Sequence, residues 1–178
     1  MSDKLLFIHV PKTGGLSIVT AMREGGLDFY KSPRSHFLVS ERAARIGSEF
    51  ENVTSFAVVR NPITRYASAC RQLRLNPNSG EALAHAKRQY RSNFKGRLLL
   101  TQSQFLMIDD EIAVKNIFKF EEDIPEGVYD WLVEQGLEGL DELPHKHNRR
   151  APLPELEPEV EEAVRKIYAR DFEAFGYE

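Results

Sequence analysis

The chain has little cysteine and lacks long apolar runs. Cys70 is the only cysteine among 178 residues, so no disulfide can form within the chain. No apolar run approaches the length of a membrane-spanning helix, and no leader with a charged, an apolar and a small-residue part precedes the first strand pattern. These absences predict a cytoplasmic protein that binds no membrane. They also make a buried, inert thiol the expected state of Cys70.

Repeats, low-complexity segments and linker-like stretches are also missing from the sequence. The composition, 42% hydrophobic and 29% charged, is that of an ordinary globular protein and excludes a disordered chain. A length of 178 residues is enough to bury a substantial core. We therefore expect a single domain over residues 1–178, and nothing in the composition bears on its oligomeric state.

Acidic residues are scarce in the middle of the chain. Residues 60–97 carry nine Lys or Arg and a single acid, Glu81, whereas residues 109–178 carry twenty acids and eight Lys or Arg. Such a basic segment favours the binding of an anionic cofactor or acceptor, although a solvated helix face is the alternative for the part beyond Arg74. The net charge of −3 and the absence of a recognisable module predict that the chain binds no nucleic acid.

Apolar periodicity predicts strands that alternate with helices. The expected strands are residues 4–10, 54–60 and 113–119, and the expected helices are residues 15–24, 36–47, 63–74, 80–93, 126–135 and one that begins at Pro158. Continuous apolar strands between helices are typical of a parallel sheet that is covered on both faces, with ligands at the carboxyl ends of the strands. The expected fold class is therefore α/β, a three-layer sandwich with a central, mainly parallel sheet.

The most informative segment is residues 9–17, which read HVPKTGGLS and follow the apolar run Leu5–Ile8. Glycines let the backbone approach an anion, and the free amides and dipole of the following helix favour its negative charge. A nucleoside-triphosphatase loop has its lysine after the glycines, whereas Lys12 precedes them here, so the turn suits one phosphate group rather than a triphosphate. The alternative is an ordinary strand-to-helix turn with a solvated lysine.

A second strand, turn and helix follow the first. A second buried-strand pattern, Ser55–Val59, ends at Arg60, and Arg65 and Ser68 are three positions apart on one face of the next helix. Guanidinium groups and a hydroxyl offer hydrogen-bond donors for a second phosphate. The alternative is a capped turn with a surface salt bridge.

In the order and spacing of these two motifs, the chain resembles the sulfotransferases that use 3′-phosphoadenosine 5′-phosphosulfate, in particular the branch typified by carbohydrate sulfotransferases. Weaker similarity continues through residues 118–121 and 168–177, whereas residues 73–104 match nothing recognisable. The resemblance implies a fold like that of the P-loop-containing nucleoside triphosphate hydrolases.

The resemblance also assigns binding residues. It implies that the 5′-phosphosulfate is held by six consecutive residues, Lys12, Thr13, Gly14, Gly15, Leu16 and Ser17. The 3′-phosphate is expected to contact Arg60 and Ser68. Leu16 departs from the family, which often has a hydroxyl residue at this position, but the amide of a leucine can still bind a phosphate.

The implied reaction is an in-line transfer of the sulfuryl group to an acceptor hydroxyl or amine, with release of adenosine 3′,5′-bisphosphate. Lys12 is expected to neutralise charge on the leaving phosphate oxygen. A saccharide is the expected acceptor, with a phenol, a lipid head group or another small metabolite as alternatives. We expect no metal, because the histidines and the single cysteine lack the spacing of zinc ligands.

His36 is the candidate general base, since an unshifted histidine pKa suits proton removal near neutrality. A capping or surface group is the alternative, and His9 is expected to be a hydrogen-bonded core residue. Arg149 and Arg150 lie in a basic loop that is expected to cover the 3′-phosphate or the adenine, with a surface cluster as the alternative. Three further side chains are candidates to orient the site: Gln102, Gln104 and Glu121.

Two other functions are consistent with phosphate-binding motifs. A small-molecule or nucleoside kinase would need magnesium and an acid at a strand end, where this chain offers Arg60 instead. A non-catalytic regulator that senses adenosine 3′,5′-bisphosphate would keep the phosphate contacts but would not need the chemistry of Lys12 and His36.

Overall fold

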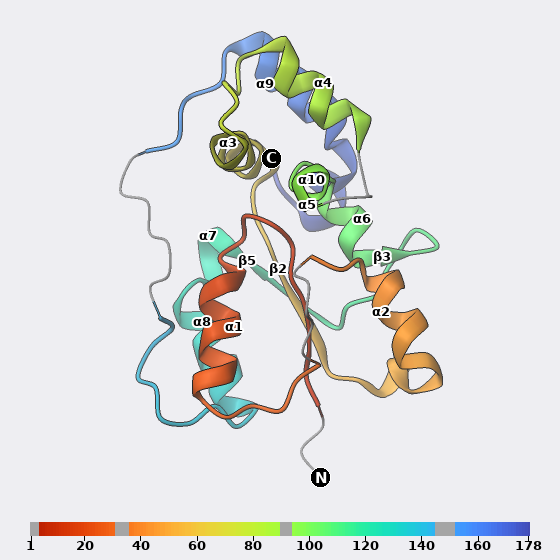
Figure 1. Ribbon diagram of the computed structural model, residues 1–178, viewed down its shortest axis with the longest axis vertical. Helices are drawn as coiled ribbons and strands as arrows, with labels where there is room; N and C mark the ends of the chain where they lie inside the picture. The colour runs from red at the N-terminus through yellow and green to blue at the C-terminus, as the bar shows by residue number, and fades with distance from the viewer. Residues whose placement is uncertain (1–3, 31–35, 90–93, 145–151) are drawn as a thin grey trace.

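Three short parallel strands form the centre of the structure, a computed structural model that describes residues 4–30, 36–89, 94–144 and 152–178 (Figure 1). The strands are β1 (Leu6–Ile8), β2 (Ser55–Val59) and β5 (Asn116–Lys119). They lie in the order β1-β2-β5, with Phe7 opposite Phe56 and Val58 opposite Phe118. Every residue of β1 and β2 is buried, which explains why both strands have continuous apolar sequences.

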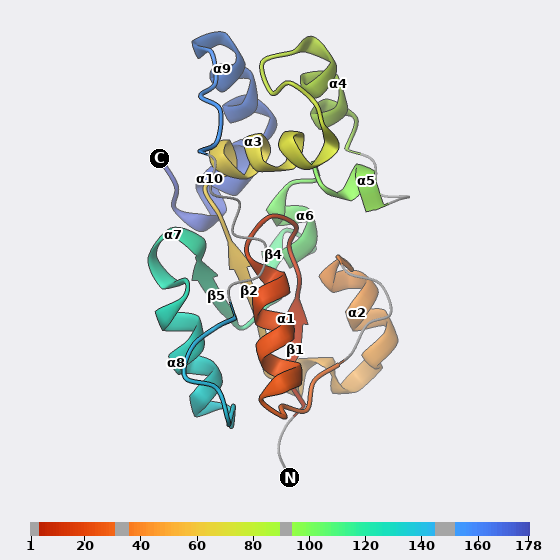
Figure 2. The same cartoon turned by 60° about the vertical axis from the view of Figure 1, so that its left-hand side comes forward.

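Helices cover both faces of this sheet (Figure 2). One face packs against α1 (Gly15–Glu24) and α8 (Glu126–Glu134), and the other against α2 (Val39–Ile46), α6 (Gln102–Leu106) and α10 (Ala169–Phe175). Phe7 enters the first core, whereas Leu6 and Ile8 enter the second, as the alternation of side chains along a strand requires. The expected α/β class with a parallel sheet is confirmed.

Three helices lie beyond the carboxyl ends of the strands (Figure 1), and a third apolar cluster lies among them. It is built by α3 (Pro62–Leu73), α4 (Gly80–Arg88) and α9 (Pro158–Ile167), and α9 contacts both of the other helices. Cys70 is fully buried in this cluster, and burial raises the pKa of its thiol to about 11. The thiol is therefore protonated and inert at neutral pH, as the sequence predicts.

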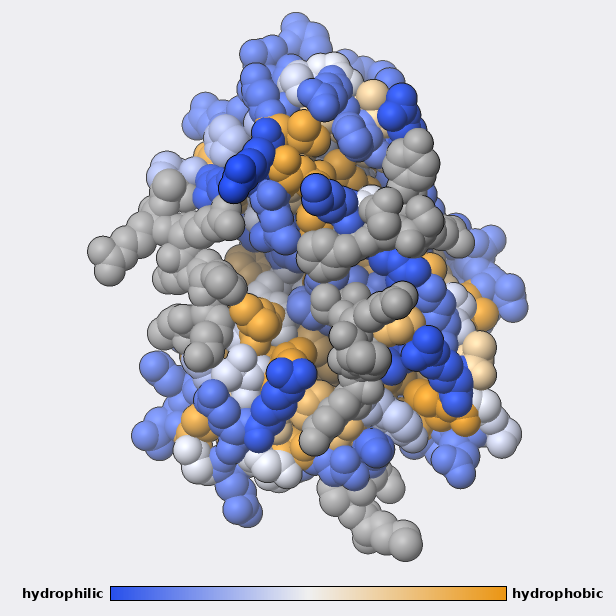
Figure 3. Space-filling model, in the orientation of Figure 1, coloured by the Kyte–Doolittle hydropathy of each residue, from blue (hydrophilic) through white to orange (hydrophobic). Residues whose placement is uncertain are grey.

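The remaining elements are short connections. They are η1 (Gly47–Asn52), α5 (Phe94–Arg97), β3 (Met107–Ile108), β4 (Glu111–Ile112) and α7 (Phe120–Asp123). Strands β3 and β4 form an antiparallel hairpin that the sequence did not predict, and its turn residues Asp109 and Asp110 both have positive φ. Hydrophilic side chains cover most of the face that Figure 3 shows, and apolar side chains form smaller patches.

Two expected helices are shorter than predicted. Helix α2 begins at Val39 rather than at residue 36, because His36 has a φ of 69° and Leu38 donates its amide to the Glu41 carboxylate as the N-cap residue. Helix α4 ends at Arg88 because Gln89 adopts a left-handed conformation.

The expected last helix is also interrupted. It divides at Tyr168, a fully buried residue whose hydroxyl donates to the carbonyl of Leu99. Helix α9 precedes this residue and α10 follows it. None of the described helices is both long enough and apolar enough to cross a membrane.

Candidate functional site

The loop between β1 and α1 lies at the carboxyl end of β1, beneath α3 (Figure 1). Lys12 and Gly14 both have positive φ, 72° and 77°, and the Thr13 hydroxyl donates to the Val10 carbonyl at 2.9 Å. Thr13 therefore uses its side chain to close the turn. Within the described residues, the amides of residues 13–16 donate to no acceptor, so they are available to an anion.

Ser17 and Leu16 differ from the other residues of this loop in the groups that they can offer to an anion. Ser17 donates its amide to the Gly14 carbonyl at 3.0 Å, so this amide belongs to the first turn of α1. Leu16 has a side chain that is 44% exposed, which leaves its amide as the group that can contact a ligand. The backbone of the loop is thus arranged for anion binding, whereas the Leu16 and Thr13 side chains are not.

Arg60 directly follows β2 and reaches the same loop. Its Nη1 donates to the Lys12 carbonyl at 3.3 Å, and its Nε donates to the Thr64 hydroxyl at 3.1 Å. The guanidinium lies 4.4 Å from the centre of the Phe120 ring. A Cβ added at Gly14 would lie only 3.3 Å from the same ring, so Phe120 packs against both the loop after β1 and the turn that contains Arg60.

Helix α3 presents a polar face to this loop. The Lys12 ammonium donates to Oε1 of Gln72 at 2.9 Å, and Thr64 is bound by Arg60. Ser68 lies four residues after Thr64 and four residues before Gln72, so it is on the same face of the helix, between these two contacts. Within the described residues the Ser68 hydroxyl has no hydrogen-bond partner. The structure therefore brings Ser68 close to Lys12 and Arg60.

Arg65 does not join this face, contrary to the sequence-based expectation. It is only 1% exposed, and its guanidinium donates to the carbonyls of Leu98 and Leu100. The same group lies 5.4 Å from the centre of the Tyr168 ring. Arg65 is a structural residue because it satisfies buried carbonyls that no sequence pattern reveals.

Two of the three further candidates support the Arg60 turn. The Gln102 side chain accepts from the Arg60 amide and donates to the Arg60 carbonyl, both at 2.8 Å. Glu121 accepts from the Asn61 amide at 2.9 Å and from the Tyr177 hydroxyl at 3.0 Å. Gln104 differs from these, because its Oε1 is buried without a partner among the described residues.

His36 lies beside His9 near this loop. Its Nδ1 is 3.0 Å from the His9 carbonyl, and the two ring centres are 4.3 Å apart. Since a carbonyl only accepts, Nδ1 must carry the proton, and Nε2 is then the basic nitrogen of the neutral ring. Arg97 fixes the segment from the other side by donating to the His36 carbonyl at 2.8 Å.

The expectation of an unshifted His36 pKa is wrong. Burial, together with the positive charges of Lys12 and Arg97, lowers this pKa to about 4. The imidazole is therefore neutral throughout the physiological range, although it is a weaker base than the sequence suggests.

His9 contributes to the shape of the loop. Burial, together with His36 and Lys12, lowers its pKa to about 3, so this ring is neutral as well. A Cβ added at Gly15 would lie 2.2 Å from Cδ2 of His9. The ring thus occupies the space beside the first residue of α1, which explains why a glycine stands there.

Arg149 and Arg150 lie outside the described residues.

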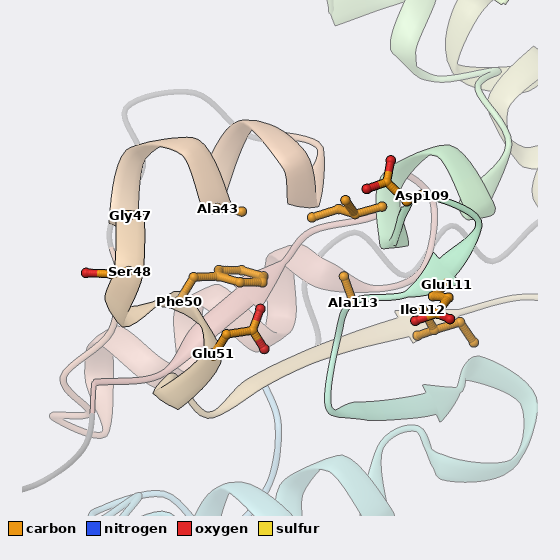
Figure 4. Close-up of a pocket in the computed structure, with 10 residues that line it drawn as sticks. Ala43, Gly47, Ser48, Phe50, Glu51, Asp109, Glu111, Ile112 and Ala113 are labelled. Atoms are coloured by element: carbon orange, nitrogen blue, oxygen red, sulfur yellow. The ribbon is translucent and has the colours of Figure 1, made fainter.

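An open groove of about 540 Å³ lies between the β3–β4 hairpin and the segment formed by the carboxyl end of α2 and η1 (Figure 4). None of the predicted site residues lines it. Across residues 4–30, 36–89, 94–144 and 152–178, no group of three or more His, Cys, Asp or Glu side chains is arranged to hold a metal ion.

Comparison with known proteins places the chain in a family. No significant match was found among curated proteins or among solved structures. A model of the sulfotransferase family, however, matches residues 1–106, which is more than half of the chain. The matched residues include both predicted phosphate-binding elements, the loop that contains Lys12 and the turn that contains Arg60. The chain therefore belongs to the sulfotransferase family.

Proposed function

We propose that the protein transfers a sulfuryl group from 3′-phosphoadenosine 5′-phosphosulfate to an acceptor hydroxyl and releases adenosine 3′,5′-bisphosphate. Membership of the family supports sulfuryl transfer in general, while the donor and the acceptor are our proposal. The observation that supports it most is the meeting of two phosphate-binding elements: the Arg60 guanidinium lies 3.3 Å from the Lys12 carbonyl at the carboxyl ends of adjacent strands.

The two ends of the donor would occupy these two elements. The amides of residues 13–16 and the Ser17 hydroxyl would hold the 5′-phosphosulfate, with the Lys12 ammonium beside it. Arg60 and Ser68 would hold the 3′-phosphate, because a guanidinium and a hydroxyl both donate to phosphate oxygens. Arg149 and Arg150 would cover the nucleotide.

The reaction needs neither a covalent intermediate nor a metal in this proposal. The acceptor oxygen attacks sulfur, and the bond between sulfur and the bridging oxygen of the 5′-phosphate breaks in line with it. Lys12 neutralises the negative charge that grows on that oxygen. The acceptor proton passes to Nε2 of His36, whose low pKa means that transfer occurs only once the new O–S bond has made the acceptor oxygen acidic.

Further parts of the proposal rest on the sequence alone. A saccharide is the proposed acceptor because the motifs are similar to those of the carbohydrate sulfotransferases. Residues 1–178 are proposed to form a single domain with a P-loop-like nucleotide-binding fold and to act in the cytoplasm, without binding nucleic acid or membranes.

Calorimetric titration in the presence of a chelator tests the proposed donor. Adenosine 3′,5′-bisphosphate, ADP and ATP are titrated separately into the protein. We expect tight, metal-independent binding of the bisphosphate and weaker binding of ADP and ATP, because only the bisphosphate presents a 3′-phosphate to Arg60. A preference for ATP, or a requirement for magnesium, would contradict the proposal and favour a kinase.

A further inference from the structure

A buried carboxylate from the last helix caps helix α6. Asp171, in α10, is fully buried, and its two oxygens accept from the amides of Gln102 and Ser103 at 2.7 and 2.8 Å. These amides begin α6 and have no partner within the helix. The Thr101 hydroxyl accepts from the Gln104 amide in the same turn, so Asp171 and Thr101 together bind the first amides of α6 and fix where it starts.

The first side chain of α6 in turn fixes the backbone of Arg60. Gln102 is fully buried, and its amide group forms a closed pair of hydrogen bonds with the Arg60 amide and carbonyl, both 2.8 Å long. The pairing of β2 with β5 ends at Val59, so Arg60 is the first residue beyond the sheet. The Gln102 side chain thus binds the backbone of Arg60, as a neighbouring strand binds the residues within the sheet.

The contacts of the Arg60 guanidinium are less restrictive than those of its backbone. Nη1 and Nε make hydrogen bonds of 3.3 and 3.1 Å, and the third contact is the face of Phe120. A long side chain with such contacts keeps its place only if its backbone is held. The direction in which Arg60 points therefore depends on Gln102, and through the start of α6 on Asp171.

We infer that Gln102 and Asp171 are positioning residues for the nucleotide site, holding Arg60 so that its guanidinium meets the 3′-phosphate of the donor. This inference rests on the proposed function. Asp171 lies outside residues 1–106, the part that matches the family model, so the site depends on the carboxyl-terminal helix of this chain. Neither residue contacts the reacting atoms in this scheme.

Nucleotide selectivity separates positioning from a purely structural role. In Gln102→Met, which keeps the length of the side chain but not its hydrogen bonds, and in Asp171→Asn, the dissociation constants of adenosine 3′,5′-bisphosphate and of adenosine 5′-monophosphate are measured. We expect the preference for the bisphosphate to fall about tenfold in each variant, while the affinity for the monophosphate changes by less than about twofold.

Val128→Ala is the matched control. Val128 is fully buried in α8, on the face of the sheet opposite to α6 and α10, so its truncation lowers stability without removing a contact of Arg60. Its selectivity should equal that of the wild type. Wild-type selectivity in the folded Gln102 and Asp171 variants would overturn the inference, and Asp171→Asn decides alone if Gln102→Met does not fold. A wild-type protein without any preference for the bisphosphate would instead overturn the proposed function.

Discussion

Lys12 and Gln72 are sixty positions apart, yet the ammonium of Lys12 donates to the side-chain carbonyl of Gln72 at 2.9 Å. This contact joins the loop after β1 to the exposed side of α3, one helical turn beyond Ser68. The ammonium is therefore held between the loop after β1 and α3, where the leaving phosphate of the proposed donor would lie.

Replacement of Lys12 by alanine tests whether this ammonium is catalytic. In Lys12→Ala we expect kcat for sulfuryl transfer to fall by about 10²–10³-fold, because a preorganised charge at the leaving oxygen is lost. The affinity for adenosine 3′,5′-bisphosphate should change less, by about tenfold or below, since the loop amides remain. Lys166→Ala is the control, because Lys166 pairs with Glu162 on the surface of α9. Unchanged turnover in Lys12→Ala would refute the catalytic role, and a wild-type protein that binds the bisphosphate without transferring sulfate would favour a regulator.

Arg60 and Arg65, five positions apart, should respond in opposite ways to the same change. Arg60→Met should weaken bisphosphate binding by about ten- to a hundredfold while leaving the melting temperature nearly unchanged. Arg65→Met should lower the free energy of unfolding by about 3 kcal/mol, because the buried carbonyls of Leu98 and Leu100 lose their donor. Calorimetry and thermal denaturation measure the two effects, and a reversal of this pattern would mean that the roles of the two arginines are exchanged.

His36→Asn removes the candidate base with little change to the backbone. Asparagine tolerates the positive φ of residue 36, and its amide can donate to the His9 carbonyl in place of Nδ1. We expect kcat to fall by about 10²–10⁴-fold, with an unchanged KM for the donor.

The pH profile of the wild-type enzyme gives a second test of His36. Only the neutral imidazole accepts a proton, and its pKa is about 4, so activity should stay level from neutrality down to about pH 5 and decline below it. The His36→Asn variant should lack this acidic limb. An acidic limb that persists unchanged in His36→Asn would exclude His36 as the base.

Gly15 and His9 should be energetically coupled. Gly15→Ala places a methyl group 2.2 Å from Cδ2 of His9, so we expect a loss of about 1–3 kcal/mol in unfolding free energy. The double variant with His9→Ala removes the obstructing ring, and its loss should be clearly smaller than the sum of the two single losses. Additive losses in chemical denaturation would show that the ring can move aside without cost.

Local sequence patterns predicted the parts of the structure that depend on neighbouring residues. Helix α1 has the expected bounds, 15–24, because the glycines and the apolar spacing are all within the segment. Arg60 stands at a strand end because the apolar run before it is continuous. The hairpin of β3 and β4 was missed because strands of two residues are too short to show an alternation.

Contacts between distant segments account for the errors at the site. Arg65 has the same spacing from Ser68 whether it points to a ligand or into the core, and only the position of Leu98 and Leu100 decides between the two. The pKa of His36 depends on burial and on charges that come from residues 12 and 97. The hydrogen bonds of Gln102 to Arg60 likewise join residues 42 positions apart, so the sequence named Gln102 as a candidate to orient the site but could not indicate which residue it binds.

The ring of Phe120 has a thermodynamic consequence for ligands. Because this one ring rests against Gly14 and also lies under the guanidinium of Arg60, a ligand that shifts either loop must displace a surface shared with the other. The two proposed phosphate sites, at the loop after β1 and at Arg60, are then coupled. The binding free energies of two fragments that each carry one phosphate should therefore not sum to the binding free energy of the intact nucleotide.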